Sequence, residues 1–355
     1  GPEELPPPRV EGNLVIETWP MPTLPGAAQH DLVLAADGRI LLSWIQSEPG
    51  RRPSFRFNAI TPGSAWEGGR TIAMGNKMFV NWADTPHITA GNDGALWAHW
   101  LQKSDDKPYA YDVMLVRSTD NGLNWSAPVK VHGDDTTTEH GFVSMWPQGE
   151  NGLGIAWLDG RKTAALAPEG GDAHAGHADH GGGPMSLRAN TFDTDLNPGE
   201  EVELDGMTCD CCQTDATRTR DGLLLVYRGR TEAEIRDIFA TRFDGKAWSK
   251  PVRVHADDWT MPACPVNGPS VAAVQDRAVI AWYTAPKGIP MVRIAASTDG
   301  GRAFAAPVTL DEGAEVLGRV AVALEPKHAW IAWLREDKGV QSLWLSRRSP
   351  DLAKE

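Results

Sequence analysis

Six repeats of one short pattern constrain the fold of this 355-residue chain more than any other feature. Each repeat contains an apolar run that ends in an aromatic residue, and the final aromatics are separated by 56, 57, 70, 55 and 51 residues. Spacing of this kind is typical of repeat architectures, in which each unit buries its faces against its neighbours. The six runs are Leu41–Trp44, Leu96–Trp100, Gly154–Trp157, Leu224–Tyr227, Val279–Trp282 and Trp330–Trp333.

Each run is the second of four short strands. Turn signals such as Asp37-Gly38 and Asp221-Gly222 precede the runs, and residue pairs of this type form tight hairpins. Another apolar strand lies upstream of each turn, and a third and a fourth strand follow the run. We therefore predict an all-β protein, a six-bladed β-propeller of four-stranded antiparallel blades.

The two ends of the chain bear on ring closure and on domain organisation. The last repeat runs out of chain after its third strand, near Ser346, so we expect the N-terminal strand at Leu14–Thr18 to supply the missing outer strand. Residues 1–12 are a proline-rich lead of the kind that tethers a domain. Residues 13–355 form a single propeller domain, and an insertion at 163–184 explains the one long step between repeats.

A turn motif between the third and fourth strands carries a family resemblance. Ser118–Trp125 and Ser297–Phe304 both follow the pattern S-x-D-x-G-x-x-aromatic, with a shortened copy at Phe243–Trp248. This pattern resembles the Asp box of sialidases and other BNR-repeat proteins. The resemblance implies a sialidase-like propeller with its Asp boxes on the face opposite the active site, and it does not by itself imply an activity.

Charge narrows the classes of partner. The formal net charge is -13, which argues against nucleic acid or an anionic membrane surface and is compatible with cations as ligands. No apolar run is long enough for a transmembrane segment. We expect a periplasmic or extracellular location, with possible tethering through the N-terminal lead; the sequence is silent on oligomeric state.

Three of the four cysteines lie within four consecutive positions, Cys209, Cys211 and Cys212, and the fourth is Cys264. Propeller topology places these residues, with several His and Met, in links between blades on one face. Thiolate and imidazole ligands together suit copper(I) or another soft ion. The order Cys-x-Cys-Cys differs from the Cys-x-x-Cys of most zinc knuckles, which disfavours a structural zinc. The predicted ligands are Cys209, Cys211, Cys212, Cys264, His140 and His87.

The insertion supplies a second set of candidate ligands, because His174, His177 and His180 lie in a stretch of His, Gly and Ala that cannot form a core. We expect this stretch to be an accessory metal loop over the same face. The metal hypothesis implies sequestration, transfer or tolerance of copper outside the cytoplasm, with a metal-delivery protein or a small acidic ligand as further partners.

Two other interpretations stay open. An even number of cysteines in an exported protein is often simply a set of disulfides, and Cys264 is close enough in the fold to pair with a member of the cluster. The propeller would then be an interaction scaffold. The resemblance instead implies a sialidase-type glycoside hydrolase, for which we name a possible pocket of Arg161, Arg228, Arg230, Arg236 and Asp237. Whether the chain is an enzyme is left open. The early Arg motif of the sialidase family is missing from this chain, and the best-placed tyrosines of this chain occupy packing positions.

Overall fold

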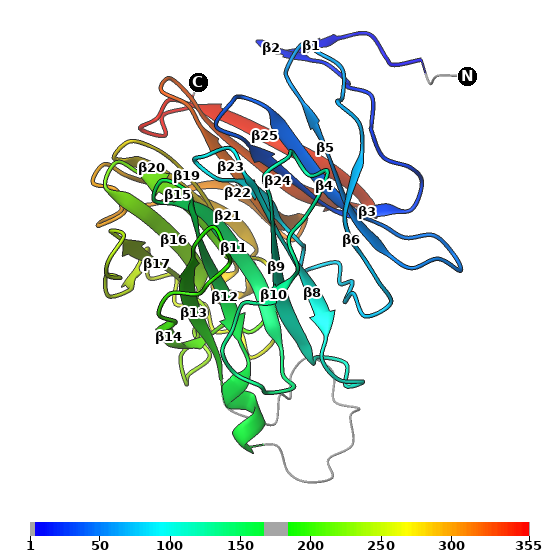
Figure 1. Ribbon diagram of the computed structural model, residues 1–355. Helices are drawn as coiled ribbons and strands as arrows, with labels where there is room; N and C mark the ends of the chain where they lie inside the picture. Colours follow the sequence, from blue (N-terminus) through cyan, green and yellow to red (C-terminus); the bar gives the residue numbers. More distant parts are fainter. Residues whose placement is uncertain (1–3, 167–183, 355) are drawn as a thin grey trace.

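The strands form six antiparallel sheets in a ring, and the computed structural model describes residues 4–166 and 184–354. Five sheets have four strands and the last has three (Figure 1). The first three blades are β3 (Ala27–Leu34), β4 (Ile40–Gln46), β5 (Ser54–Ile60) and β6 (Arg70–Met74); β7 (Ile88–Ala90), β8 (Leu96–Lys103), β9 (Tyr111–Ser118) and β10 (Val129–Lys130); and β11 (His140–Gln148), β12 (Gly152–Asp159), β13 (Met185–Phe192) and β14 (Val202–Thr208). The other three are β15 (Asp215–Thr219), β16 (Gly222–Arg228), β17 (Ile238–Phe243) and β18 (Val252–Arg253); β19 (Ser270–Val274), β20 (Arg277–Thr284), β21 (Met291–Ser297) and β22 (Val308–Glu312); and β23 (Val316–Leu324), β24 (Ala329–Asp337) and β25 (Val340–Arg348).

This arrangement confirms the predicted propeller. All six apolar runs lie in the second strand of a blade, and their final aromatics are at most 7% exposed. Two short 3-10 segments, η1 (Arg161–Leu166) and η2 (Pro286–Gly288), each follow such a second strand. In the described ranges no helix has the length and apolarity required to cross a membrane.

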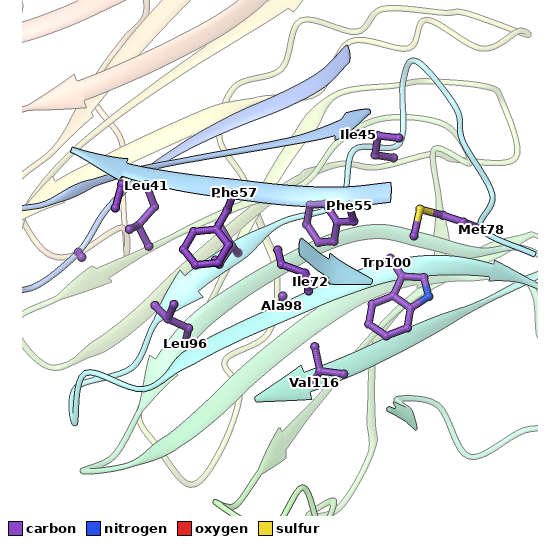
Figure 2. Packing of buried hydrophobic residues seen from close by; sticks show 13 residues of the cluster. Leu41, Ile45, Phe55, Phe57, Ile72, Met78, Leu96, Ala98, Trp100 and Val116 are labelled. Carbon is purple, nitrogen blue, oxygen red and sulfur yellow. The ribbon is translucent and has the colours of Figure 1, made fainter. Parts of the chain in front are cut away.

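The core lies between blades rather than within one central cluster. Figure 2 shows the first of these junctions, where Phe55 and Phe57 of β5 pack against Leu96 and Ala98 of β8. Similar buried clusters join the second blade to the third, the third to the fourth, the fourth to the fifth and the fifth to the sixth. Each blade is therefore held by its neighbours, and the links between blades sit on a rigid support.

Closure of the ring differs from our prediction. The N-terminal β2 (Leu14–Ile16) pairs with β1 (Arg9–Glu11) in a hairpin of its own, so the expectation that Leu14–Thr18 completes the last blade is wrong. Gly12, with φ of 61°, and Asn13 form a two-residue turn, and such a local hairpin closes at far less entropic cost than a pairing across the whole chain. The outer edge of β25 consequently exposes Leu343 and Trp344.

The Asp boxes are structural turns. In the second blade the Ser118 hydroxyl donates to Asp120, and the Gly122 amide donates to the Ser118 oxygen, at 2.8 and 2.9 Å. The fifth-blade copy repeats these bonds, and both central glycines have positive φ. These turns join third to fourth strands, whereas the cysteine run joins a fourth strand to the next first strand.

Candidate functional site: a cysteine cluster between blades

The cysteine run lies in the link between β14, the outer strand of the third blade, and β15, the inner strand of the fourth. The Cys209 amide donates to the Arg228 carbonyl at 3.1 Å, which pins the start of the link beside the end of β16. Further along, the Gln213 side chain donates to the Ala83 carbonyl at 2.7 Å and accepts from the Gly268 amide at 3.0 Å. The link is therefore tied to neighbours on both sides, and its thiols have defined positions.

Two of the four cysteines form a disulfide. Cys211 is bonded to Cys264, with the Cα atoms 6.0 Å apart across 53 residues of sequence. The bridge connects the link before the fourth blade to the link before the fifth. It confirms that Cys264 pairs with a member of the cluster, and it removes these two sulfurs from the predicted four-cysteine ligand set as long as the bridge is intact.

The other two cysteines are free thiols in contact with each other. Cys209 and Cys212 are 0% and 1% exposed, and their sulfur atoms lie 2.8 Å apart. They are three residues apart, so the run does contain a Cys-x-x-Cys spacing, which the sequence interpretation overlooked. Together with Cys211 they form a group of three sulfurs within 4.8 Å of one another, and this cluster could hold a metal ion.

The two free thiols differ in acidity. Burial alone would raise the pKa of Cys212, but the hydrogen bond from Cys209, the charge of Arg228 and the Asn267 amide outweigh burial and lower the pKa to about 7. Burial and the neighbouring Cys212 sulfur both raise the pKa of Cys209 well above its usual range. The pair therefore has one thiolate and one thiol near neutral pH, with Cys209 donating to Cys212.

Arg228 is the main positive charge at the site. Its side chain is 1% exposed, and its guanidinium donates to the carbonyls of Arg236 at 2.6 Å and Asn267 at 3.0 Å and also to that of Tyr283. It lies over the Trp259 ring, 5.0 Å from the centroid. In the described part of the chain no carboxylate oxygen comes within 4.0 Å of it, and its charge helps to lower the pKa of Cys212.

Arg236 has a different role. Its side chain is 3% exposed and pairs with Asp210 at 3.3 Å and with Glu234 at 2.9 Å. Its charge is thus already balanced by two carboxylates. Arg319, which lies over the Trp82 ring, is a third cation within electrostatic range of Cys212.

The two histidines predicted as ligands belong to networks of carboxylates rather than to the thiol cluster. His87 Nδ1 lies 2.7 Å from Asp31. His140 Nε2 lies 3.0 Å from Asp134, and its Nδ1 faces the Tyr111 carbonyl. Burial would lower the pKa of His140, but these partners raise it, so both ring nitrogens act as donors. Neither ring is grouped with sulfur among the potential metal-ligand sets of the described residues.

The network around His140 is an internal brace. His132 stacks on His140 with ring centroids 3.6 Å apart, and it shares Asp134 with it. Arg161 contacts Asp159 at 2.8 Å and also pairs with Asp134 and Glu201. Every charge here has an opposite partner, so Arg161 is occupied rather than free to bind a substrate.

The remaining residues of the predicted hydrolase pocket are engaged by partners of their own, and Arg230 shares Glu234 with Arg236. Arg230 pairs with Glu234 at 2.8 Å, and Asp237 accepts the amides of Asp258 and Trp259. The Tyr227 hydroxyl donates to Asp205 at 2.6 Å, and burial, with the charge of Asp205, raises the pKa of Tyr227 well above its usual value.

Two sets of residues complete the comparison with the sequence. His174, His177 and His180 lie outside the described residues. Asp31, Asp84 and Asp215 were not singled out from the sequence, although all three line hollows at the centre of the ring. The sequence did offer a signal for these three residues. Each lies within the innermost strand of a blade or just before it, and innermost strands line the axis of a propeller.

Comparison with solved structures agrees with the ring of blades. A structure of a protein of unknown function from Dyadobacter fermentans has a TM-score of 0.54 at 13% identity, covering 91% of this chain and 94% of that one. An ulvan lyase of polysaccharide lyase family PL25, bound to -[GlcA(1-4)Rha3S]-, has a TM-score of 0.52 at 10% identity, covering 91% and 79%. A mutant sialidase of Trypanosoma rangeli that displays trans-sialidase activity has a TM-score of 0.51 at 12% identity, covering 97% of this chain and 57% of that one.

The fold is a sialidase-like propeller. Sequence comparison adds nothing to this, because neither a protein-family model nor a curated protein matches the chain. At these identities the likeness concerns the fold alone, and the activities of the similar proteins remain theirs. This sialidase-like propeller carries a buried cysteine cluster on one face.

Proposed function

We propose that the protein binds one soft monovalent metal ion, copper(I), through Cys209 and Cys212. The observation that carries the proposal is the contact between these two unbridged thiols beside a buried arginine for which the described residues supply no carboxylate partner. Thiolates are the preferred ligands of copper(I). A pKa of about 7 for Cys212 means that the first ligand is already available as a thiolate near neutral pH.

Charge balance favours a monovalent over a divalent ion. Two thiolates with one copper(I) carry a net charge of about -1, whereas two thiolates with one zinc ion are neutral. Arg228 offers a positive charge that is not paired with a carboxylate among the described residues, whereas Arg236 is balanced by Asp210 and Glu234. A buried charge without a partner is costly, so the anionic copper complex suits this pocket better than the neutral zinc complex.

Metal binding requires the sulfur pair to open. An ion bonded to two sulfurs at about 2.3 Å each holds them at most about 4.6 Å apart, compared with 2.8 Å in the structure. Cys211 lies within 4.8 Å of both sulfurs, so reduction of its bridge would supply a third ligand. His87 and His140, with partners of their own, are not part of the proposed site.

The bridge supports a proposal about location. A disulfide persists in oxidising compartments, so the Cys211–Cys264 bond supports a periplasmic or extracellular protein. The proposed role is to sequester or pass on copper(I) there, with a metal-delivery protein as partner.

An anaerobic titration with copper(I) against a chromophoric chelator tests the proposal. The bridged parent should bind one ion per chain, and the double variant Cys209→Ser, Cys212→Ser should bind none. The matched control Cys211→Ser, Cys264→Ser removes the bridge but keeps both proposed ligands, so it should still bind one. Equal copper in the parent and in the Cys209→Ser, Cys212→Ser variant would refute the proposal, and tighter binding of zinc than of copper(I) would refute the charge argument.

A further inference from the structure

The centre of the ring contains two adjoining hollows that the copper proposal does not use. The larger, about 350 Å³, and the smaller, about 170 Å³, share Asp31, His87, Val143 and Thr214 as lining residues. They are bounded by the inner strands β3, β7, β11 and β15 and by the segments just before these strands. A cavity on the axis of a propeller, formed by several blades at once, is a usual place for a small ligand.

Carboxyl groups from three blades gather around these hollows, namely Asp31, Asp84 and Asp215. Asp84 is 2% exposed; one of its oxygens accepts the Phe142 amide at 2.9 Å, and the other, Oδ2, is buried without any partner. Asp215 accepts neutral donors, which are the amides of Ala216 and Val271 and the Ser270 hydroxyl. No Lys or Arg in the described ranges forms an ion pair with Asp84 or Asp215. His87 pairs with another lining carboxylate, that of Asp31.

Other titratable groups also lie near these carboxyl groups. His30 lines the smaller hollow, and His99 lies beside His87 with ring centroids 5.3 Å apart. Glu139 adds a further negative charge within range of Asp84. Arg218 lines the larger hollow, but its guanidinium donates to Asn92. Among the described residues Asp84 Oδ2 is buried without a hydrogen bond, which is costly, so a cationic ligand that donates to this oxygen would relieve the penalty.

The spacing and the walls distinguish an organic cation from a metal ion. Asp31, Asp84, His87 and Asp215 do not form any of the sets of three ligand atoms within 4.8 Å of one another found in the described residues. A directly coordinated metal needs its ligand atoms closer together. The wall of the larger hollow combines polar groups with apolar side chains, which include Leu32, Val33, Ile88, Val143 and Trp146. Apolar side chains beside a few separated carboxyl groups suit an ammonium group on a hydrocarbon body.

We propose that the axial hollows bind a small primary amine, whose ammonium group donates to Asp84 Oδ2 and to Asp31 or Asp215 and whose carbon chain lies against the apolar walls. The ammonium has three donors, which matches several carboxylates arranged around one space. The site is separate from the thiol cluster, so the amine and copper(I) bind independently.

Isothermal titration with butylamine and with 1,4-diaminobutane tests this inference, with 1-butanol as an uncharged probe of similar shape. Both amines should bind to the parent and butanol should not. Asp84→Asn keeps the shape and the acceptor for the Phe142 amide but removes the ionisable carboxyl group that would pair with the ammonium, so amine affinity should fall at least tenfold. Asp215→Asn should weaken binding as well, and it provides a second variant if Asp84→Asn folds poorly.

The control is Asp135→Asn, which removes an equally negative but fully exposed carboxylate that pairs with Lys130. Its amine affinity should equal that of the parent. The inference is overturned by any of three results: no heat with either amine, equal amine affinity in Asp84→Asn and the parent, or tight binding of Ca²⁺ or Mn²⁺ that the amines do not displace. Copper(I) binding should be the same in Asp84→Asn and the parent, so a failure here is distinguishable from a failure of the copper proposal.

Discussion

Asp84 should make this protein less stable as pH rises from acid to neutral, and replacing it with Asn should remove that effect. Burial, with a smaller contribution from the charge of Glu139, raises the pKa of Asp84 to about 8 from a usual value of 3.8, while the Phe142 amide opposes the rise. Asn has nearly the same shape and still accepts the Phe142 amide through its carbonyl oxygen. The substitution therefore tests the charge and little else.

The sign follows from proton binding. Below about pH 4 the carboxyl is protonated in both the folded and the unfolded chain, so it carries no penalty. Between pH 4 and 8 the unfolded chain loses the proton while the folded chain keeps it, and the free energy of unfolding falls. At about 1.4 kcal/mol per pKa unit, a rise from 3.8 to about 8 corresponds to a loss on the order of 5 kcal/mol.

Denaturant unfolding of the parent and of Asp84→Asn, measured at intervals from pH 4 to 9 with the disulfide intact, checks this expectation. The stability of the variant relative to the parent should increase with pH and level off above about pH 8. Asp215, with a pKa raised by burial to about 6, is a graded comparison: Asp215→Asn should show a smaller gain that levels off near pH 6. A relative stability of Asp84→Asn that stays constant or falls over this range would refute the reasoning.

Three further predictions concern the cysteines, the tyrosine of the fourth blade and an Asp box. Unfolding without reductant should reveal two thiols, and the native protein almost none, because Cys209 and Cys212 are at most 1% exposed; four thiols on unfolding would contradict the bridge. Tyr227→Phe loses one hydrogen bond to Asp205 and should cost about 1–2 kcal/mol of stability while copper(I) binding is unchanged, as a chelator titration can show. Gly301→Ala should cost about 2–4 kcal/mol in denaturant unfolding, since its φ is 89° and a Cβ would lie 2.5 Å from Leu224; Gly94→Ala, with positive φ but open space, should cost clearly less.

Much of the fold could be predicted because its signals are local. An apolar strand, a tight turn and a terminal aromatic such as Trp157 or Trp282 can be read within about ten residues, and repetition made the pattern unmistakable. Closure of the ring could not be predicted in the same way. It required a choice between a local hairpin at Gly12 and a pairing across more than 300 residues, and turn chemistry favoured the hairpin.

The candidate site was predictable only in part. Topology alone placed Cys209, Cys211 and Cys212 on one face and near Cys264. Which sulfurs bond and which stay free depends on Cα separations and side-chain directions within the packed links, and the sequence carries no record of these. The same holds for His140, whose partners Asp134 and Asp159 come from different elements.

The sequence by itself determined that this chain is a six-bladed ring with its cysteines in links on one face, because repeat spacing and strand alternation are encoded by neighbouring residues. Only the tertiary structure decided that Cys211 bonds to Cys264, that Cys209 and Cys212 lie beside a buried Arg228, and that Asp84 is buried next to the axis. Each of these depends on residues from different blades meeting in a low-dielectric interior, where an unmatched charge or a shared proton becomes energetically decisive.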